Sequence, residues 1–175
     1  GAFRGGAARD GACVSAPDPR LAAAGRAAET VHASCVVVGE AGILIRGASG
    51  AGKSSLCLAL IEAATARGLF ARLVGDDRIA LARIGGALLA RPVSPLEGLL
   101  EVRGVGLLRR PHLPAARVRL VVDRMEEPPP RLPEEAQTIV EILGVALPRL
   151  ACRHDRDIVP IALERAAGLS GGPFD

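Results

Sequence analysis

Aromatic side chains are scarce in this 175-residue sequence, which has three Phe and neither Tyr nor Trp. Hydrophobic residues still make up 49% of the chain, so a core must be built from aliphatic side chains. The shortage also removes the rings on which nucleic-acid bases stack. Although the net charge is +3, no basic block is longer than Arg109-Arg110, and we therefore expect no nucleic-acid partner.

Paired cysteines and long apolar runs are missing as well. The four Cys residues stand far apart, without a Cys-x-x-Cys pair or a His at zinc-ligand spacing. Neither a disulfide framework nor a zinc site is predicted. No apolar run approaches the roughly 20 residues that span a bilayer, and the first residues lack the apolar segment of a signal peptide. These absences predict a cytoplasmic protein that does not bind membranes.

The length suits one domain. Residues 1–28 are rich in Gly, Ala, Arg and Pro without periodicity, and they are predicted to form a flexible N-terminal tail. The folded domain is expected at 29–168 and a C-terminal tail at 169–175. Within the domain, the pattern predicts strands at 33–38, 43–46, 71–84, 87–93, 99–108 and 118–122, helices at 54–67 and 158–167, and a loop at the four prolines of 126–133. Strands that outnumber helices indicate an α/β fold with a mixed, hairpin-rich sheet.

A phosphate-binding loop stands between the strand at 43–46 and the helix at 54–67. The segment Gly47–Ser54 reads G-A-S-G-A-G-K-S and matches the pattern G-x-x-x-x-G-K-S. Glycines let the backbone bring its N–H groups against phosphates, and the N-terminus of the helix adds a positive dipole end. The predicted nucleotide-binding residues are Gly47, Ala48, Ser49, Gly50, Ala51, Gly52, Lys53 and Ser54.

The single lysine of the chain supports this interpretation over a glycine-rich turn without a ligand. Of the 22 basic residues, 21 are Arg and one is Lys53, inside the motif. A compact ammonium fits among phosphates where a broad guanidinium does not. Lys53 is expected to reach the β- and γ-phosphates of ATP, and the Ser54 hydroxyl to bind Mg²⁺.

Asp76 and Asp77 lie next to each other in the predicted strand 71–84. Successive side chains of a strand point to opposite faces, so only one of the two should face the nucleotide. A carboxylate there could accept the proton of an attacking hydroxyl. We assign that role to Asp76 and a structural role to Asp77, although the two could be exchanged. The alternative is an ion pair with Arg72 or Arg78.

Four further positions are candidates for chemistry. Glu101 and Arg103 are two residues apart in the predicted strand 99–108, so an acid for Mg²⁺ and a base for phosphate would share one face. A surface charge pair is the alternative. His32, just before the first predicted strand, and Arg131, in the proline loop, could each reach a phosphate or be structural.

Together these segments resemble the C-terminal domain of HPr kinase/phosphorylase, which phosphorylates a serine of the phosphocarrier HPr. The resemblance covers about 31–167 and depends on the loop, on L-V-G-D-D-R-I and above all on L-E-V-R-G-V-G-L. It implies a P-loop kinase fold related to phosphoenolpyruvate carboxykinase, and a homo-hexamer that uses ATP and Mg²⁺. The residues it implies are Asp76 as proton acceptor, His32, Lys53 and Arg131 as active-site residues, and Ser54 and Glu101 as Mg²⁺ ligands.

The resemblance also implies a second reaction, in which inorganic phosphate removes the phosphoryl group from the serine. The family's Pro-rich segment for that reaction appears here only as 152–157, C-R-H-D-R-D, without its Pro or Gly. Asp155 stands at the expected turn and would repel an incoming anion, so we predict weak or absent phosphorolysis. Two other functions remain open: a small-molecule kinase, and a nucleotide-binding regulatory module without transfer activity.

Overall fold

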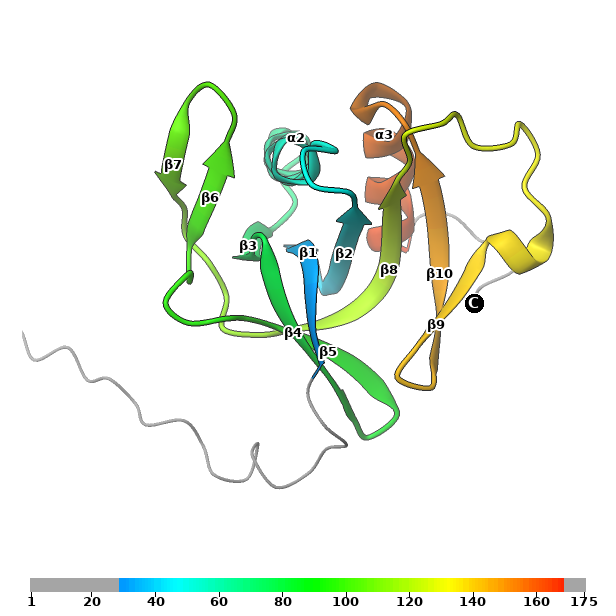
Figure 1. Cartoon of the computed structure of the whole chain (residues 1–175), viewed down its shortest axis with the longest axis horizontal. Helices are drawn as coiled ribbons and strands as arrows, with labels where there is room; N and C mark the ends of the chain where they lie inside the picture. Colours follow the sequence, from blue (N-terminus) through cyan, green and yellow to red (C-terminus); the bar gives the residue numbers. More distant parts are fainter. Residues whose placement is uncertain (1–28, 169–175) are drawn as a thin grey trace, which may run out of the picture.

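The computed structural model describes residues 29–168; the tails predicted at 1–28 and 169–175 lie outside the described residues. Its strands are β1 Glu29–Val38, β2 Ala41–Gly47, β3 Ala71–Gly75, β4 Arg78–Ile84, β5 Ala87–Pro92, β6 Leu99–Val102, β7 Gly106–Arg109, β8 Ala116–Arg124, β9 Ile139–Ile142 and β10 Val145–Cys152. Its helices are α2 Lys53–Ala66, α3 Asp155–Ala166 and the short 3₁₀ helix η1 Glu135–Gln137. The predicted α/β class with a mixed, hairpin-rich sheet is confirmed (Figure 1).

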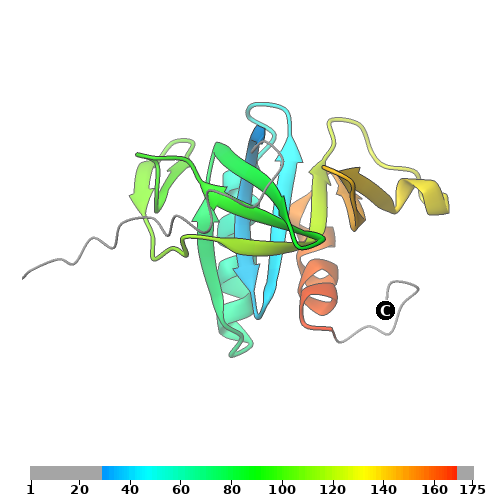
Figure 2. The ribbon, with the colours of Figure 1, turned by 90° about the horizontal axis from the view of Figure 1, so that it is seen from below.

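The main sheet is built around the β1–β2 hairpin, which the sequence predicted. β1 pairs antiparallel with β2 along one edge, and on the other edge with β4 in its first half and β3 in its second half. β2 pairs in parallel with β8, and β8 also pairs with β5 and with β10. Because β4 and β5 pair with each other, the strands β2, β1, β4, β5 and β8 close into a ring. The β6–β7 hairpin and the β9–β10 pair lie at opposite ends of the molecule (Figures 1 and 2).

Two hydrophobic clusters cover the two faces of this sheet. Alternation along β1 divides its side chains between them, since Val36 and Val38 pack with α2 and α3 while Cys35 and Val37 pack inside the ring. Leu56 and Leu60 of α2 are fully buried against the first cluster. Aliphatic residues fill both clusters, as the lack of aromatics required. Burying one such Leu side chain is worth roughly 1.5–3 kcal/mol.

Two predicted strands are each divided into two. The strand expected at 71–84 stops at Gly75, bends at Asp76 and Asp77, and resumes as β4. Asp77 has a φ of 65°, a left-handed conformation that Asp tolerates better than most residues. The strand expected at 99–108 is a hairpin, β6–β7, so Arg103 lies in its turn and does not share a strand face with Glu101. Both corrections have the same cause. In each case apolar residues on both sides of a short turn gave the appearance of one continuous strand.

The sequence analysis also missed β9 and β10, which follow the proline loop. Leu143 and Gly144, both with positive φ, form the turn between these strands, which span 139–142 and 145–152. The predicted helix at 158–167 begins three residues earlier, at Asp155. Among residues 29–168, no helix is long and apolar enough to cross a bilayer.

A charge cluster joins the strand before the phosphate loop to the C-terminal strands. Arg46 of β2 donates to Asp123 of β8 from Nε and Nη2, at 2.8 Å each, and Arg149 of β10 donates from Nε at 2.5 Å. Burial by itself raises the pKa of Asp123, but these hydrogen bonds and the two positive charges outweigh it and lower that pKa below its usual value. Asp123 is therefore charged in the folded protein and holds three strands in register.

This cluster predicts a pH-dependent loss of stability in Asp123→Asn. Since the folded-state pKa is lowered, the charged carboxylate stabilises the fold above the unfolded-state pKa of about 3.9, and its contribution disappears as the pH falls through the folded-state value. We expect Asp123→Asn to lower the free energy of unfolding by about 2 kcal/mol at neutral pH and by less at pH 3. Urea unfolding of both proteins at several pH values measures this. Glu127→Gln, in the exposed loop after β8, is the control. An equal loss of unfolding free energy at neutral pH and at pH 3 would contradict a stabilising role for the Asp123 charge.

Candidate functional site

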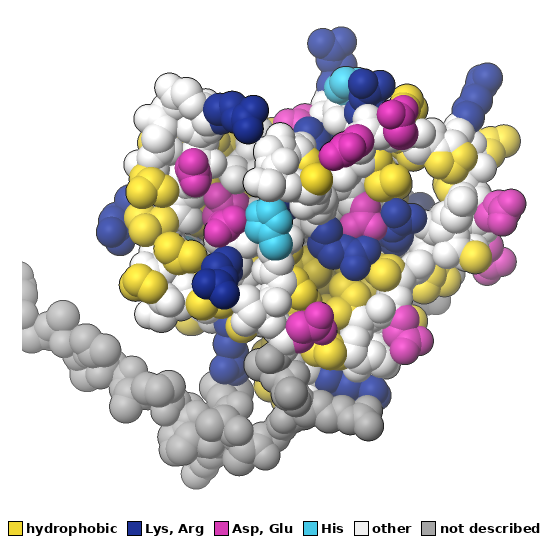
Figure 3. Space-filling view, in the orientation of Figure 1, with side chains coloured by type: hydrophobic (Ala, Val, Ile, Leu, Met, Phe, Trp, Pro, Cys, Tyr) yellow, Lys and Arg dark blue, Asp and Glu magenta, His cyan; other side chains and the backbone are white. Residues whose placement is uncertain are grey.

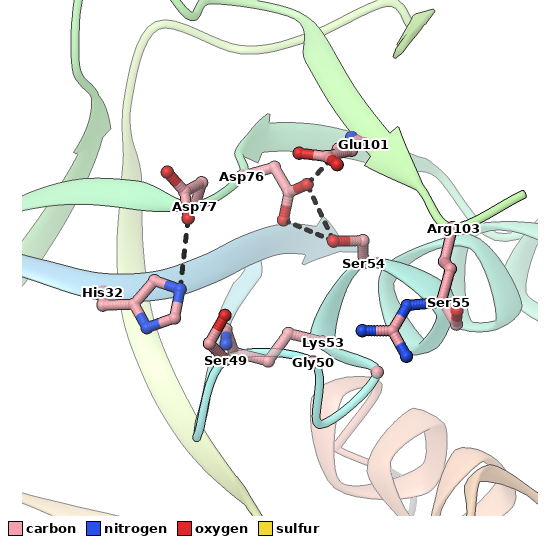
Figure 4. A pocket seen from close by; sticks show the side chains of 11 residues that line it. His32, Ser49, Gly50, Lys53, Ser54, Ser55, Asp76, Asp77, Glu101 and Arg103 are labelled. Atoms are coloured by element: carbon pink, nitrogen blue, oxygen red, sulfur yellow. Dashed lines mark hydrogen bonds and ion pairs between the residues drawn. The ribbon is translucent and has the colours of Figure 1, made fainter. Parts of the chain in front are cut away.

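A pocket of about 290 Å³ opens above the phosphate loop (Figure 4). It is lined by residues of β1, the loop, α2, the β3–β4 turn and the β6–β7 hairpin: His32, Ser49, Gly50, Gly52, Lys53, Ser54, Ser55, Asp76, Asp77, Glu101 and Arg103. The structure therefore brings together most of the site residues predicted from the sequence. Acidic and basic side chains are interspersed on this face of the molecule (Figure 3). Attraction of an anion thus depends on local donors and not on a broad positive field.

The phosphate loop has the backbone that its glycines permit. Gly50 and Gly52 have φ of 78° and 84°, and α2 begins directly after Gly52, at Lys53. The first N–H groups of a helix have no acceptor within it and point toward its N-terminal end, where they can bind an anion. Gly47, Ala48 and Ala51 shape this loop from behind and are not among the residues that line the pocket.

The Lys53 side chain folds back over the loop. Its Nζ donates to the carbonyl oxygens of Gly47 at 3.0 Å and Ala48 at 2.9 Å. Burial lowers the pKa of Lys53, while the negative charges of Asp76 and Asp77 act in the opposite direction. An ammonium that is partly desolvated and held by neutral carbonyls is ready to exchange them for phosphate oxygens.

Asp76 is buried and surrounded by hydrogen-bond donors. Its carboxylate accepts from Ser34 Oγ at 2.5 Å, from Ser54 Oγ at 2.8 Å and from the backbone N–H of Glu101 at 3.1 Å. Only 5% of Asp76 is exposed, so its charge is stabilised by these donors and not by solvent. Its hydrogen bond with Ser54 leaves the oxygen lone pairs of that hydroxyl facing the pocket.

Ser34 is a site residue that the sequence analysis did not identify. It is fully buried and donates the shortest of the hydrogen bonds to Asp76. One signal could have found it, because Ser34 is the only strongly polar side chain in the apolar run 33–38. A buried hydroxyl needs a partner, and the carboxylate just after the neighbouring strand β3 is such a partner.

Asp77 points away from Asp76 and toward β1. Its Oδ1 lies 3.1 Å from Nε2 of His32, and both side chains are largely exposed at the pocket. The two carboxylates thus separate as expected, although a turn and not strand alternation directs them (Figure 4). Asp77 retains oxygen lone pairs that an incoming hydroxyl could reach.

Glu101 and Arg103 form the opposite wall of the pocket. The backbone of Glu101 is tied to Asp76, and Arg103 reaches the phosphate loop so closely that its Nη2 would lie 3.0 Å from a Cβ built on Gly50. The β6–β7 hairpin therefore carries both residues to the loop. Arg131 is different, since it is exposed in the loop between β8 and β9 and does not line the pocket.

Oxygen ligands for a divalent cation come from three segments, α2, the β3–β4 turn and β6. The Ser54 hydroxyl and the Asp76 carboxylate are adjacent, and the Glu101 side chain lines the same pocket. Within residues 29–168, no group of three or more His, Cys, Asp or Glu side chains is arranged to hold a metal by itself. This set suits Mg²⁺, which binds one or two protein oxygens and completes its shell with water and phosphate.

Asp155 does not present a free carboxylate near the loop. It lies in the first turn of α3, where Arg124 Nη1 donates to its Oδ1 at 2.5 Å. The repulsion of an incoming anion that the sequence suggested therefore has no basis, because a guanidinium neutralises this charge. Arg124 was not identified from the sequence either, and it also contacts the loop itself.

Comparison with known proteins agrees with this geometry. The model of the family described as HPr Serine kinase C-terminal domain matches residues 25–113. The chain is 41% identical over 76 residues to the HPr kinase/phosphorylase of Mycoplasma mycoides and 45% identical over 78 residues to that of Clostridium beijerinckii. These matches cover 43% and 45% of this chain but 22% and 24% of the relatives, so the chain matches about a quarter of their length.

A solved structure extends the likeness beyond that segment. The Hpr(Ser) kinase/phosphatase of Coxiella burnetii superimposes with a TM-score of 0.64 at 27% sequence identity. The superposition covers 81% of this chain and 97% of the other. The likeness in fold therefore extends over a larger share of the chain than the family match at 25–113.

Asp76 and Asp77 have different surroundings, so their substitution should change the free energy of unfolding by different amounts. Asp76→Asn places an amide donor against hydroxyl and N–H donors, and we expect it to lower the free energy of unfolding by about 2 kcal/mol. Asp77→Asn keeps a residue type that tolerates positive φ, and we expect a change within about 0.5 kcal/mol. Urea unfolding of both variants at neutral pH measures the difference. A larger loss in Asp77→Asn would show that the turn, and not the buried cluster, stabilises this region.

Proposed function

This chain belongs to the HPr Serine kinase C-terminal domain family, and we propose that it transfers the γ-phosphoryl group of ATP to a serine of an HPr-type phosphocarrier protein. The observation that carries this proposal is one pocket in which a phosphate loop faces two carboxylates with different surroundings. A loop alone would support nucleotide binding only. The second, accessible carboxylate adds a group that can take a proton from an acceptor.

The phosphates of ATP bind to the loop. The N–H groups at Gly50 and Gly52 and at the start of α2 surround the β-phosphate, while Lys53 leaves its loop carbonyls for the β- and γ-oxygens. Arg103 approaches the same loop at Gly50 and adds a second positive charge beside the γ-phosphate.

Ser54 and Asp76 would hold Mg²⁺ together, with Glu101 as a further oxygen ligand. When bound, the ion neutralises charge on the β- and γ-phosphate oxygens. Asp76 orients the Ser54 hydroxyl through the hydrogen bond at 2.8 Å, so the oxygen of Ser54 faces the pocket. Because Asp76 is only 5% exposed while Asp77 is largely exposed, a hydroxyl of a protein substrate reaches Asp76 less easily than Asp77.

Asp77 is the better proton acceptor, which exchanges the two roles first assigned from the sequence. The acceptor serine oxygen attacks the γ-phosphorus, a new O–P bond forms, the bond to the bridging oxygen breaks, and ADP leaves. The serine proton passes to Asp77. His32, 3.1 Å from that carboxylate, orients it and can stabilise its charge. Both groups lie at the exposed side of the pocket, where a protein substrate can approach.

The remaining expectations stay predictions. The similarity to HPr kinases supports HPr as the acceptor, and the resemblance to that family supports a homo-hexamer. Arg131 could act in the pocket only if its loop moved toward β6, because the two lie at opposite ends of the molecule (Figures 1 and 2). Weak phosphorolysis is still expected from the missing Pro and Gly of segment 152–157, and no longer from repulsion by Asp155.

A transfer assay tests the proposal. The purified chain is incubated with γ-labelled ATP, Mg²⁺ and HPr, and the labelled residue is identified by mass spectrometry. We expect phosphoserine on HPr. Lys53→Ala should reduce the rate by about 100-fold or more, because a charge that stabilises the transition state is lost. Lys53→Arg should also be strongly impaired, since a guanidinium does not fit the same place. Thermal unfolding confirms that both variants are folded.

Other outcomes separate the competing functions. Label on a small molecule and none on HPr would support a small-molecule kinase. Tight ATP binding without label on any acceptor would support a regulatory module. A Lys53→Ala protein with normal activity would remove the loop from the mechanism.

The roles of the two carboxylates predict opposite kinetic effects. Asp77→Asn should lower kcat by about 100-fold with little change in the KM for ATP or in the Mg²⁺ requirement. Asp76→Asn should instead raise the Mg²⁺ concentration that gives half-maximal rate. Initial rates over a matrix of ATP and Mg²⁺ concentrations measure both. A loss of kcat in Asp76→Asn at unchanged Mg²⁺ requirement, with normal kcat in Asp77→Asn, would return the proton-accepting role to Asp76.

A further inference from the structure

Arg124, the last residue of β8, lies directly beneath the phosphate loop. Its side chain is mostly buried, with 11% exposed. Nε donates to the carbonyl oxygen of Ala51 at 2.9 Å, and Nη1 donates to Asp155 at 2.5 Å. Nη1 also lies 3.9 Å from the sulfur of Cys152. One side chain thus connects the middle of the loop to the end of β10 and the start of α3.

The glycines that frame the motif both pack against this residue. A Cβ built on Gly47 would lie 2.8 Å from the Cβ of Arg124, and a Cβ built on Gly52 would lie 2.9 Å from its Nη2. Contacts this short are essentially never made by real Cβ atoms. Beyond its positive φ, Gly47 therefore requires glycine because the Cβ and backbone of Arg124 occupy the space behind it, whereas at Gly52 an added Cβ would meet the guanidinium end of Arg124.

The hydrogen bond to Ala51 determines which way the next N–H points. The Ala51–Gly52 peptide is trans, so the carbonyl of Ala51 and the N–H of Gly52 point in opposite directions from one plane. With the carbonyl directed down to Arg124, the N–H is directed up, into the pocket that Gly52 lines. No backbone carbonyl of residues 29–168 accepts a hydrogen bond from it.

We propose that Arg124 is a positioning residue of the phosphate site: it holds the Ala51–Gly52 peptide so that the Gly52 N–H faces the phosphates of the nucleotide. Asp155 in turn holds the guanidinium, which pre-organises the loop before the nucleotide arrives. The inference rests on the nucleotide site of the proposed function. Arg124 at the end of β8 and Asp155 at the start of α3 thus support phosphate binding without touching the nucleotide.

The test uses the full chain and the variant Arg124→Met, which keeps an unbranched apolar stem of similar length. We expect the ratio of ADP affinity to AMP affinity to be about tenfold lower in the variant than in the unmodified chain. The reason is that the loop binds the β-phosphate, which ADP has and AMP lacks. In ¹H–¹⁵N spectra, ADP should shift the Gly52 amide strongly in the unmodified chain and weakly in the variant. Arg149→Met is the matched control, because Arg149 also joins a carboxylate to a backbone carbonyl but contacts no residue of the loop.

Each outcome decides for or against the inference. An unchanged ADP-to-AMP ratio and Gly52 shift in folded Arg124→Met would overturn it, as would an equal loss in Arg149→Met, which would indicate general destabilisation. If Arg124→Met does not fold, Asp155→Asn serves instead. This variant keeps Arg124 but weakens its hydrogen bond to residue 155, and we expect the ratio of ADP affinity to AMP affinity to fall about threefold. No loss there would overturn the inference. An unmodified chain that binds no ADP would overturn the proposed function itself, and the inference with it.

Discussion

β2 pairs with β1 on one side and, in parallel, with β8 on the other, and the site depends on this arrangement. The parallel pairing brings the C-terminal ends of β2 and β8 to one edge, so Gly47 lies opposite Arg124 and the phosphate loop starts where β8 ends. The same β2–β1 pairing sets Ala33 opposite Arg46, which places His32 and Ser34 beside the loop. Residues far apart in the sequence therefore meet at the phosphate loop, because β2 and β8 end there and β1 passes beside it.

The second constraint is the short turn between β3 and β4. The turn places Asp76 and Asp77 outside the regular pairing of the strands, so the two carboxylates have different neighbours. Asp76 accepts from hydroxyls and a backbone N–H, whereas Asp77 lies beside an imidazole. Groups with such different environments suit different tasks in catalysis. A continuous strand would also have separated the two side chains, but it would have sent one of them into the ring-enclosed core, where an unpaired charge is costly.

Local sequence signals predicted the loop, α2, the β1–β2 hairpin and the set of residues at the pocket. These features depend on short-range chemistry: glycines before a Lys-Ser pair, helix formers up to Gly68, and apolar runs on both sides of a turn. The break at Asp76–Asp77, the β6–β7 turn and the strands β9 and β10 were missed, because an apolar run does not show where a tertiary contact bends it. Ser34 and Arg124 were missed, and Asp155 was given the wrong role, for a related reason, since their interactions involve partners 31 to 73 residues away. No motif records such pairings.

The distribution of positive charge explains why one lysine stands among so many arginines. Arg46, Arg149 and Arg124 each donate from a planar fork to a fixed carboxylate, and they hold strands and loop in one geometry. Their charges are thereby compensated and attract a nucleotide little. Lys53 instead binds only neutral carbonyls through its Nζ, on a flexible stem, and faces the pocket. These three guanidinium groups thus hold the frame, whereas Lys53 and Arg103 at the pocket are the two positive charges that the proposed function assigns to phosphate.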